Sequence, residues 1–381
     1  MLAAMLLAAE RVLRKKTRRL EPAQVRRVLV LEYLLPLGCL VHMTPVFEAI
    51  KRSRPEIEVS VATRGLGLQV LRHSRFVDHL IEAPDPTIHL GAAVRGLRKE
   101  LLTRRIHPDC VLTGASDQRT RIALMAMLGT DGWRGGYTIK SALYQRPLAY
   151  DHSLSLICNN LRLAKLLGCE ADVTRPRIFF SEEDVATAKT LLHEANPDGR
   201  PLVVMVTQGS GGQRTGWHTE RFVQVIDHAS RACGCAVVYV GTAVDASAIE
   251  AICQDAGGVG TSLAGKTTAT ELAAVLALSD SMVTLDTGTM HVGRAVGVPM
   301  VVLGPSWQKP LEWMPLGVEN VRILRGEDRA NVPPEYRLDE VSAESVVAAL
   351  DDLMKLYPAS AEGRTQRLLD GLSAVEHLAR V

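Results

Sequence analysis

The sequence Ser281-Met-Val-Thr-Leu-Asp-Thr-Gly-Thr-Met-His291 joins a short, largely apolar stretch to a polar turn that contains a glycine. Residues 281–285 have the length of a buried strand, and a helix through residues 292–295 follows the turn. A helix N-terminus carries unpaired N–H groups and partial positive charge, so it is suited to bind phosphate. Gly288 permits close backbone approach, and Thr287, Thr289 and His291 add side-chain donors. The same string also fits a plain helix cap by Asp286 or Thr287.

Strands and helices alternate on both sides of this stretch. In the second half of the chain we expect strands at 202–206, 236–240, 281–285 and 300–303, with helices at 218–232 and 268–279. An earlier set has strands at 28–31, 57–62, 77–81 and 110–112, with helices through 44–50, 92–104 and 155–168. Strands that alternate with helices predict parallel sheets. The fold class is therefore α/β, with two Rossmann-like doubly wound domains facing a cleft.

The length of 381 residues fits two such domains with terminal additions. We expect a basic amphipathic segment over 1–22 and a first domain over 23–180. A second domain over 195–340 follows, and 341–381 should form helices, with or without a return to the first domain. The stretch 172–181 is the expected passage between the domains.

Composition excludes several classes of protein. Lys and Arg number 44 against 42 Asp and Glu, a balance that argues against nucleic acid as a partner. The seven cysteines are scattered, and the spacing of Cys233-Gly-Cys235 does not match a zinc site. We expect reduced, mostly buried thiols in a cytoplasmic protein. No apolar run is long enough to span a bilayer.

The first 20 residues concentrate positive charge, with six Lys and Arg between Arg11 and Arg19 and a single acid, Glu10. In a helix, Leu2, Leu6 and Leu13 would share one side. We expect this segment either to dock on anionic lipid at the inner face of the plasma membrane or to pack on the domain as a solvated helix.

Three further loops follow predicted strands. The glycine-rich stretch 208–217 has no Walker lysine and lacks the full dinucleotide fingerprint, so a flexible loop is its plain interpretation. Asp245 follows the strand at 236–240 and either accepts from ribose hydroxyls or caps the next helix. The turn 36–42 follows the first strand. None of these loops calls for a bound cofactor.

Taken in order, these strings resemble glycosyltransferase family 9. The resemblance covers about residues 26–320. The matching stretches are Leu37-Gly-Cys-Leu-Val-His-Met-Thr-Pro45, His107-Pro-Asp109, Asn159-Asn-Leu161, Trp217-His-Thr-Glu-Arg-Phe222, Leu263-Ala-Gly-Lys-Thr-Thr268, Asp286-Thr-Gly-Thr-Met-His291, Gly297-Val-Pro299 and Leu303-Gly-Pro305.

The resemblance implies a GT-B fold and inverting transfer of a sugar, typically heptose from ADP-heptose, to a glycolipid such as the lipopolysaccharide inner core. It implies that Asp245 holds the ribose, that Thr287, Gly288 and His291 hold the diphosphate, and that Asp286 holds the sugar hydroxyls. Because the chain has no Asp-X-Asp string, fixed dipoles rather than a metal should stabilise the leaving diphosphate. Thr289, Ser210, Arg214 and Thr215 complete the expected donor site, and Arg64 and Arg119 are the expected acceptor-binding residues.

Two positions depart from the family pattern. Cys39 stands where the family has the acid that is the usual candidate for general base. Thr215 stands where the family has a lysine, and Arg214 could replace its contact to phosphate. We expect His42 or Asp117 to act as the base instead, with the Cys39 thiol as the remaining option.

Two classes of function stay open at this point. One is an active transferase, whose acceptor could also be a protein or a small metabolite. The other is a non-catalytic protein that binds a nucleotide sugar and has lost the base. A Rossmann oxidoreductase is disfavoured because the dinucleotide fingerprint is absent.

Overall fold

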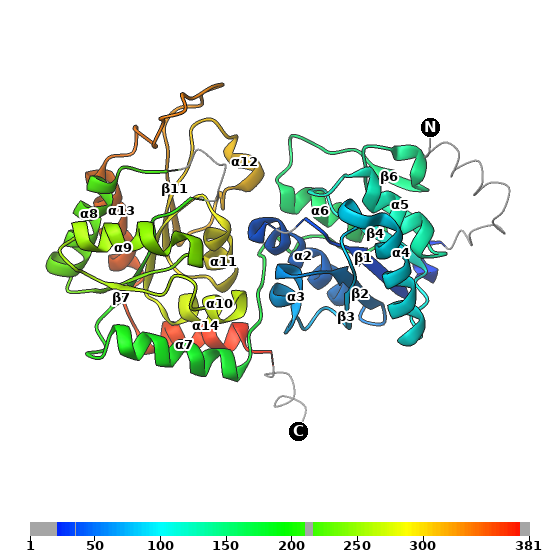
Figure 1. The fold of residues 1–381 in the computed structure, drawn as a ribbon, viewed down its shortest axis with the longest axis horizontal. Coiled ribbons are helices and arrows are strands. Elements are labelled where there is room, and N and C mark those ends of the chain that lie inside the picture. The colour runs from blue at the N-terminus through cyan, green and yellow to red at the C-terminus, as the bar shows by residue number, and fades with distance from the viewer. Residues whose placement is uncertain (1–20, 35, 210–215, 374–381) are drawn as a thin grey trace. The chain divides into compact units, whose positions relative to one another are not determined.

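The computed structural model describes residues 21–34, 36–209 and 216–373, and the chain divides into two compact units (Figure 1). The first unit is Met1–Pro176 and the second is Arg177–Val381. The division falls inside the 172–181 stretch that the sequence indicates as the passage between domains. The predicted membrane-binding segment, residues 1–20, lies outside the described residues. None of the described helices is long and apolar enough to cross a membrane.

The first unit is built on one parallel sheet in the order β3-β2-β1-β4-β5-β6. Its strands at residues 27–31, 58–63 and 110–113 run through mostly buried and largely aliphatic residues, as expected where a sheet is covered on both faces. The strands are β1 (Arg27–Leu31), β2 (Glu58–Thr63), β3 (His79–Glu82), β4 (Cys110–Thr113), β5 (Trp133–Tyr137) and β6 (Arg146–Leu148).

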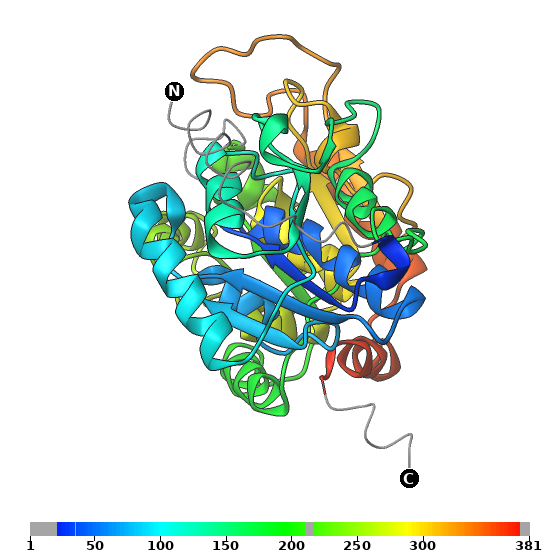
Figure 2. The same ribbon diagram turned by 90° about the vertical axis from the view of Figure 1, so that its right-hand side faces the viewer.

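Helices cover both faces of this sheet. Helices α4 and α5 pack together on one face, whereas α2 packs with α6 and with α3. In Figure 2, which faces this unit, α4 runs along one side of the sheet. The bounds are α2 (Leu37–Ser53), α3 (Leu66–Leu71), α4 (Pro86–Thr103), α5 (Thr120–Gly129) and α6 (Leu156–Lys165), with short 3-10 turns η1 (Pro22–Gln24) and η2 (Ser141–Leu143).

Helix α2 begins earlier than the sequence predicts and runs through Pro45. A proline inside a helix has no N–H for the carbonyl four residues before it, here that of Val41. The hydroxyl of Thr44 donates a 2.8 Å hydrogen bond to this carbonyl instead. The helix is therefore continuous from the turn after β1 to Ser53.

The second unit repeats the same topology, with a parallel sheet in the order β12-β11-β10-β7-β8-β9. Its central strands are the apolar runs that the sequence predicts. The strands are β7 (Leu202–Val206), β8 (Ala236–Tyr239), β9 (Thr261–Ser262), β10 (Ser281–Leu285), β11 (Met300–Leu303) and β12 (Val321–Leu324).

Helices again cover both faces. Helices α8 and α13 contribute to one core with β7, β8, β10 and β11, while α10 packs against α7, α11 and α14 (Figure 1). The bounds are α7 (Glu182–Ala195), α8 (Thr219–Asp227), the π-helical turn η3 (His228–Ala232), the 3-10 turn η4 (Ala243–Asp245), α9 (Ala246–Asp255), α10 (Ala269–Leu278), α11 (Gly288–Val296), α12 (Pro310–Trp313), α13 (Ala343–Leu356) and α14 (Ala361–Gly371).

The second unit extends beyond the predicted 195–340 at both ends. Helix α7 belongs to it, with Val185, Ala188 and Leu192 buried, and packs against α10. The C-terminal helices α13 and α14 also belong to this unit rather than returning to the first. Phe180 and Leu372 form a parallel bridge, so the start and the end of the unit lie side by side.

Candidate functional site

The strand order of the second unit places a ligand site at one point of its sheet. From β7 the chain moves outward to β8 and β9, and then returns to β10 and moves the other way. In parallel sheets ligands bind beyond the carboxyl ends of the two strands at such a reversal. The connections after β7 and β10 hold the two loops that the sequence singles out, 208–217 and 286–291.

The turn after β10 presents an uncapped helix N-terminus. Thr287 is the N-cap of α11, but no side chain caps the first turn. The buried Thr287 Oγ1 has no hydrogen-bond partner among the described residues. Gly293 lets α11 approach the sheet, since a Cβ there would lie 2.5 Å from Met282 Cε. The turn therefore offers backbone N–H groups and a hydroxyl to an anion.

Asp286 lies beside this turn with its carboxyl group buried. Burial raises the pKa of Asp286 to about 6. In the amide orientation that satisfies both neighbours, Gln308 donates to Asp286 Oδ2 at 3.1 Å and accepts from Trp313 Nε1 at 2.9 Å. Arg325 Nη2 in turn donates to the backbone carbonyl of Gln308 at 3.1 Å. The loop after β11 thus orients the carboxyl group of Asp286.

His291 lies one turn further along α11 and is also buried. Burial, and then the charge of Arg294, lower the pKa of His291 to about 3. The imidazole is therefore neutral at physiological pH, and one ring nitrogen carries a proton that it can donate. The rings of His291 and Trp313 lie 6.3 Å apart, centroid to centroid.

The remaining predicted donor residues divide into three groups. Gly288 and Thr289 are half-buried in the first turn of α11. Asp245 closes a capping box at η4, where its Oδ2 accepts from Thr242 N at 2.8 Å and from Thr242 Oγ1 at 2.7 Å, whereas it makes no side-chain capping bond to α9, which begins after it. Ser210, Arg214 and Thr215 lie outside the described residues.

The first unit has an equivalent reversal between β1 and β4. Glu32 follows β1 directly and is only 1% exposed. Its Oε1 accepts from Leu34 N at 3.3 Å, whereas Oε2 has no hydrogen-bond partner among the described residues. Burial, and then the charge of Asp117, raise the pKa of Glu32 to about 8. A buried carboxyl group with such a pKa at a ligand-binding edge is a candidate acid or base.

The predictions from the sequence do not include Glu32. The signal that could have revealed it is a lone acid directly after the apolar run Val28-Leu-Val-Leu31, at a strand end that faces the ligand-binding edge.

Asp117 follows β4 and binds Arg119 in a bidentate ion pair. Arg119 Nε and Nη2 each donate to one of its carboxylate oxygens at 2.7 Å. Arg119 Nη2 also donates to the Tyr33 carbonyl at 3.2 Å, which joins the loop after β4 to the loop after β1. Arg64 after β2 pairs with Asp85 at 2.8 Å. Both predicted acceptor-binding arginines are half-buried at this edge of the sheet.

Cys39 and His42 are buried in the first turns of α2. Asn160 from α6 donates to the His42 carbonyl at 3.2 Å and accepts from Ala115 N at 2.8 Å. Asn160 therefore fixes the loop after β4 against the start of α2. The three predicted candidates for the base, with Glu32, all belong to the β1 and β4 connections.

A cavity of about 550 Å³ lies in the first unit between α4 and α5. Its lining is mostly apolar, with the cationic side chains Arg95 and Arg121. Arg121 also donates to the Thr87 carbonyl, and Arg119 Nη1 lies 3.4 Å from Thr87 Oγ1. The cavity is thus linked to the β4 connection through Thr87.

Solved structures share this architecture. A glycosyltransferase family 9 protein from Veillonella parvula DSM 2008 is 20% identical with a TM-score of 0.77, covering 89% of this chain and 99% of that one. ADP-heptose lps heptosyltransferase II from E. coli is 16% identical with a TM-score of 0.70, covering 88% and 100%. E. coli heptosyltransferase WaaC, solved with ADP-2-deoxy-2-fluoro heptose, is 17% identical with a TM-score of 0.64, covering 86% and 99%. No curated protein matches the sequence.

The two doubly wound sheets and these likenesses define the fold as the GT-B type of glycosyltransferases. A family model, glycosyltransferase family 9 (heptosyltransferase), matches residues 120–336, which is more than half of the chain. The chain belongs to glycosyltransferase family 9, and the family supports glycosyl transfer as its activity. The match includes the turn 286–291 but not residues 37–45, where Cys39 departs from the expected pattern.

Proposed function

We propose that this protein is an inverting glycosyltransferase that moves a heptose-like sugar from a nucleoside diphosphate to a hydroxyl of a glycolipid. The donor is ADP-heptose and the acceptor resembles the lipopolysaccharide inner core. The observation that carries this proposal is the buried, uncapped N-terminus of α11 at the strand reversal of the second sheet. Membership of the heptosyltransferase family supports the nature of the sugar.

The donor binds with its diphosphate at the first turn of α11. Backbone N–H groups at Gly288 and Thr289, the Thr287 hydroxyl and the neutral His291 N–H donate to the phosphate oxygens. As the bond between the anomeric carbon and the phosphate oxygen breaks, negative charge grows on the diphosphate. Donors that are already oriented stabilise this charge without a metal ion. Asp286 accepts from hydroxyls of the sugar, and Asp245 exchanges its capping bonds for a ribose hydroxyl.

The acceptor hydroxyl attacks the anomeric carbon from the side opposite the diphosphate, which inverts the configuration. A base must take the hydroxyl proton as the new bond forms. Glu32 is our preferred base among the four candidates because its raised pKa gives it proton affinity near neutral pH. Asp117 is bound on both oxygens by Arg119, so it holds the arginine and shapes the field around Glu32.

A glycolipid acceptor fits the chemistry of the first unit. Arg64 and Arg119 supply positive charge for anionic groups of the core sugar, and the cavity between α4 and α5 offers an apolar lining with two further arginines. We propose a cytoplasmic enzyme that meets its acceptor at the inner face of the plasma membrane, with residues 1–20 as the contact.

One observation favours a non-catalytic binding protein as the second candidate. The family's acid is replaced by Cys39, and the alternative acid Asp117 is held in an ion pair. Such a protein would bind the nucleotide sugar without transferring it.

Purified protein separates these two candidates. Calorimetry with ADP tests the donor site, and release of ADP from ADP-heptose, with and without a lipopolysaccharide acceptor, tests turnover. An active transferase binds ADP and releases it faster with acceptor, whereas the binding protein only binds. If ADP and other nucleoside diphosphates fail to bind at millimolar concentration, both candidates are wrong.

Variants at four positions identify the base. Loss of a general base should lower turnover by about 10²–10⁴ while the affinity for ADP stays unchanged. We expect this result for Glu32→Gln. Turnover and ADP affinity of Asp117→Asn and His42→Ala are measured in the same way for comparison. Cys39→Asp should preserve or raise the rate. If the first three turn over normally and only Cys39→Ser is inactive, the thiol is the base.

A further inference from the structure

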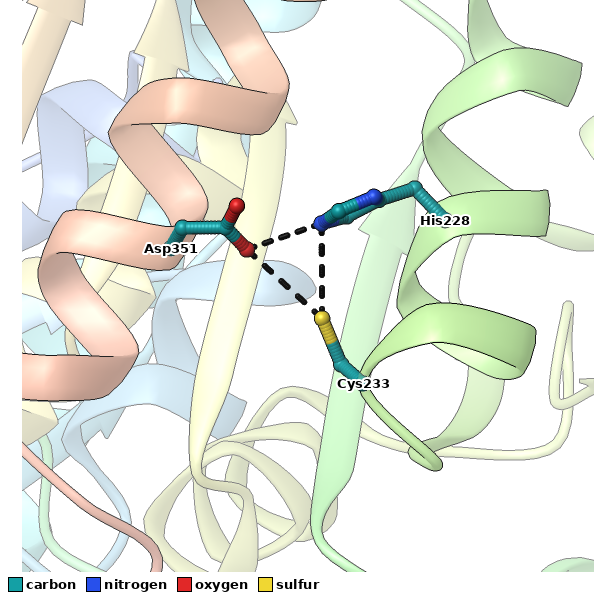
Figure 3. Close-up of side chains that lie close together, drawn as sticks. All are labelled: His228, Cys233 and Asp351. Atoms are coloured by element: carbon teal, nitrogen blue, oxygen red, sulfur yellow. Dashed lines mark hydrogen bonds and ion pairs between the residues drawn. The ribbon is translucent and has the colours of Figure 1, made fainter.

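A cluster of three possible metal ligands lies on the second unit, away from the proposed donor site. His228 and Cys233 come from the π-helical turn η3 and the residue after it, and Asp351 comes from α13 (Figure 3). Both His228 and Cys233 precede β8, so they lie toward the amino edge of the sheet. The turn 286–291 follows β10 at the opposite, carboxyl edge. The transfer reaction proposed above therefore does not use these side chains.

The three ligand atoms converge on one point. His228 Nε2 lies 2.8 Å from Asp351 Oδ1, and Cys233 Sγ lies 3.4 Å from His228 Nε2 and 3.6 Å from Asp351 Oδ1. Figure 3 shows the imidazole, thiol and carboxylate turned toward one another. A tetrahedral zinc ion with bonds of about 2.0–2.3 Å separates its ligand atoms by about 3.3–3.6 Å. Only the His228–Asp351 pair has to open, by about 0.5 Å, to reach this geometry.

The π-helical turn is what brings His228 and Cys233 together. In an α-helix, positions five residues apart point about 140° away from each other. Here Cys233 N donates to the His228 carbonyl at 3.1 Å, a hydrogen bond that spans five residues and places both side chains on one side of the turn. Such turns are rare and occur often at functional sites. The sequence predicts a plain helix over 218–232. The structure differs from this prediction at the π-helical turn His228–Ala232, where the proposed metal ligands lie.

We propose that His228, Cys233 and Asp351 form a binding site for a thiophilic divalent cation, with Zn²⁺ as the best fit. A thiolate, an imidazole and a carboxylate suit zinc, whereas magnesium and calcium prefer oxygen ligands alone. Asp351 is 49% exposed and His228 is 25% exposed, so water can fill the fourth position. The ion would join η3 to α13 and so hold α13 in place.

The pattern Cys233-Gly-Cys235 itself does not supply this site. Cys235 is fully buried, and its Sγ approaches the Cys233 carbonyl at 3.7 Å. His228 and Cys233 are five residues apart, but Asp351 lies more than a hundred residues further along the sequence, and for this reason spacing alone missed the set.

The competing explanation is a hydrogen-bonded contact without an ion. Burial, and then the charge of Asp351, raise the pKa of the Cys233 thiol, so in that case the thiol stays protonated and donates to Asp351. The two explanations differ in stoichiometric metal binding and in the spectrum of a cobalt complex.

The test uses the full chain, stripped with a chelator and dialysed. Co²⁺ should bind at one equivalent, with a thiolate charge-transfer band in the near ultraviolet and visible bands of tetrahedral coordination. Zn²⁺ should displace it and raise the Tm. Cys233→Ser should abolish the charge-transfer band, and Asp351→Asn should weaken Zn²⁺ binding by at least about tenfold. ADP affinity should not change in either variant.

Two matched controls make the result specific. Asp352→Asn removes the neighbouring acid, which is 50% exposed and paired with Arg322 instead, and should bind Zn²⁺ like the wild type. Cys158→Ser removes another half-buried cysteine, from the first unit, and should keep the cobalt band. If Cys233→Ser does not fold, His228→Gln takes its place. No stoichiometric binding, or equal binding in Asp351→Asn and Asp352→Asn, would overturn the proposal.

Discussion

Replacing Glu32 by glutamine should change how the stability of the protein depends on pH. The unfolded chain ionises this carboxyl group near the ordinary pKa of 4.5, whereas the folded protein keeps it protonated up to about pH 8. Between these values the folded state binds one proton more than the unfolded state, so the free energy of unfolding falls by about 1.4 kcal/mol per pH unit. The contribution of Glu32 is therefore fully present below pH 4.5 and is lost as the pH rises to about 8.

The magnitude follows from the width of that window. Over about 3.5 pH units the loss reaches at most about 5 kcal/mol, less whatever water recovers by reaching the ionised carboxylate. For a domain of this size, such a loss corresponds to a fall in Tm on the order of 10 °C. Glu32→Gln keeps the shape of the neutral acid but cannot ionise. The variant should therefore melt near the wild type at pH 5 and clearly above it at pH 8.5.

Calorimetric scans at half-unit steps between pH 5 and 8.5 measure this difference. The matched control is Glu48→Gln, which removes another buried carboxyl group of the first unit, one that pairs with Arg52. Because an opposite charge accompanies Glu48, we expect that variant to keep the wild-type decline of Tm with pH. If the Glu32→Gln and wild-type curves run parallel across the range, Glu32 is not a proton-binding group near neutral pH, and its proposed role as base is wrong.

Three further predictions concern the donor site and the N-terminus. His291→Ala should weaken ADP binding by about tenfold, as for one lost hydrogen bond. Because the pKa of His291 is held at about 3, its contribution to ADP affinity, measured by calorimetry, should be the same at pH 5 and pH 8. With Glu32 as the base, turnover should fall about tenfold per unit below pH 8, and protonation of Asp286, whose pKa is about 6, should steepen the fall to about a hundredfold per unit below pH 6, since the protonated carboxyl group accepts poorly from a sugar hydroxyl. Asp286→Asn should be slow at every pH and lose only the steepening below pH 6, and a variant that keeps the steeper limb would contradict the assignment. Deleting residues 1–20 should reduce co-sedimentation with anionic liposomes, and unchanged sedimentation would rule out the membrane contact.

The central strands could be predicted from the sequence because each is a short apolar run bounded by a turn. Leu202–Val206 and Ser281–Leu285 were predicted with the bounds they have in the structure. Strand β5, Trp133–Tyr137, was missed because two glycines and Arg134 hide its strand character. It forms through pairing with β4, and the buried Arg134 Nε donates to the Leu143 carbonyl at 2.8 Å. Such tertiary contacts override local preference.

The donor turn could be predicted because its chemistry is local: a strand, a glycine and a helix start lie within eleven residues. The environment of its side chains could not. The sequence does not reveal that Gln308 bridges Asp286 and Trp313, since the loop after β11 comes from another part of the chain. The low pKa of His291 is likewise a consequence of burial, which depends on the whole fold.

The resemblance predicts an acid where this sequence has Cys39, and the first strand–helix connection still holds a carboxyl group, that of Glu32. Cys39 lies in the first turn of α2, and Glu32 lies at the end of β1, so the two residues flank the same connection. This connection follows β1, which lies beside β4 at the strand reversal, so Cys39 and Glu32 both lie near the ligand-binding edge of the sheet. The Glu32 carboxyl group is held at the end of a strand and is buried, and burial raises its proton affinity. If Glu32 is the base, the carboxyl group that takes the acceptor proton comes from the end of β1 rather than from the first turn of α2. The fold then supplies the base at this connection, although the residues of the helix do not.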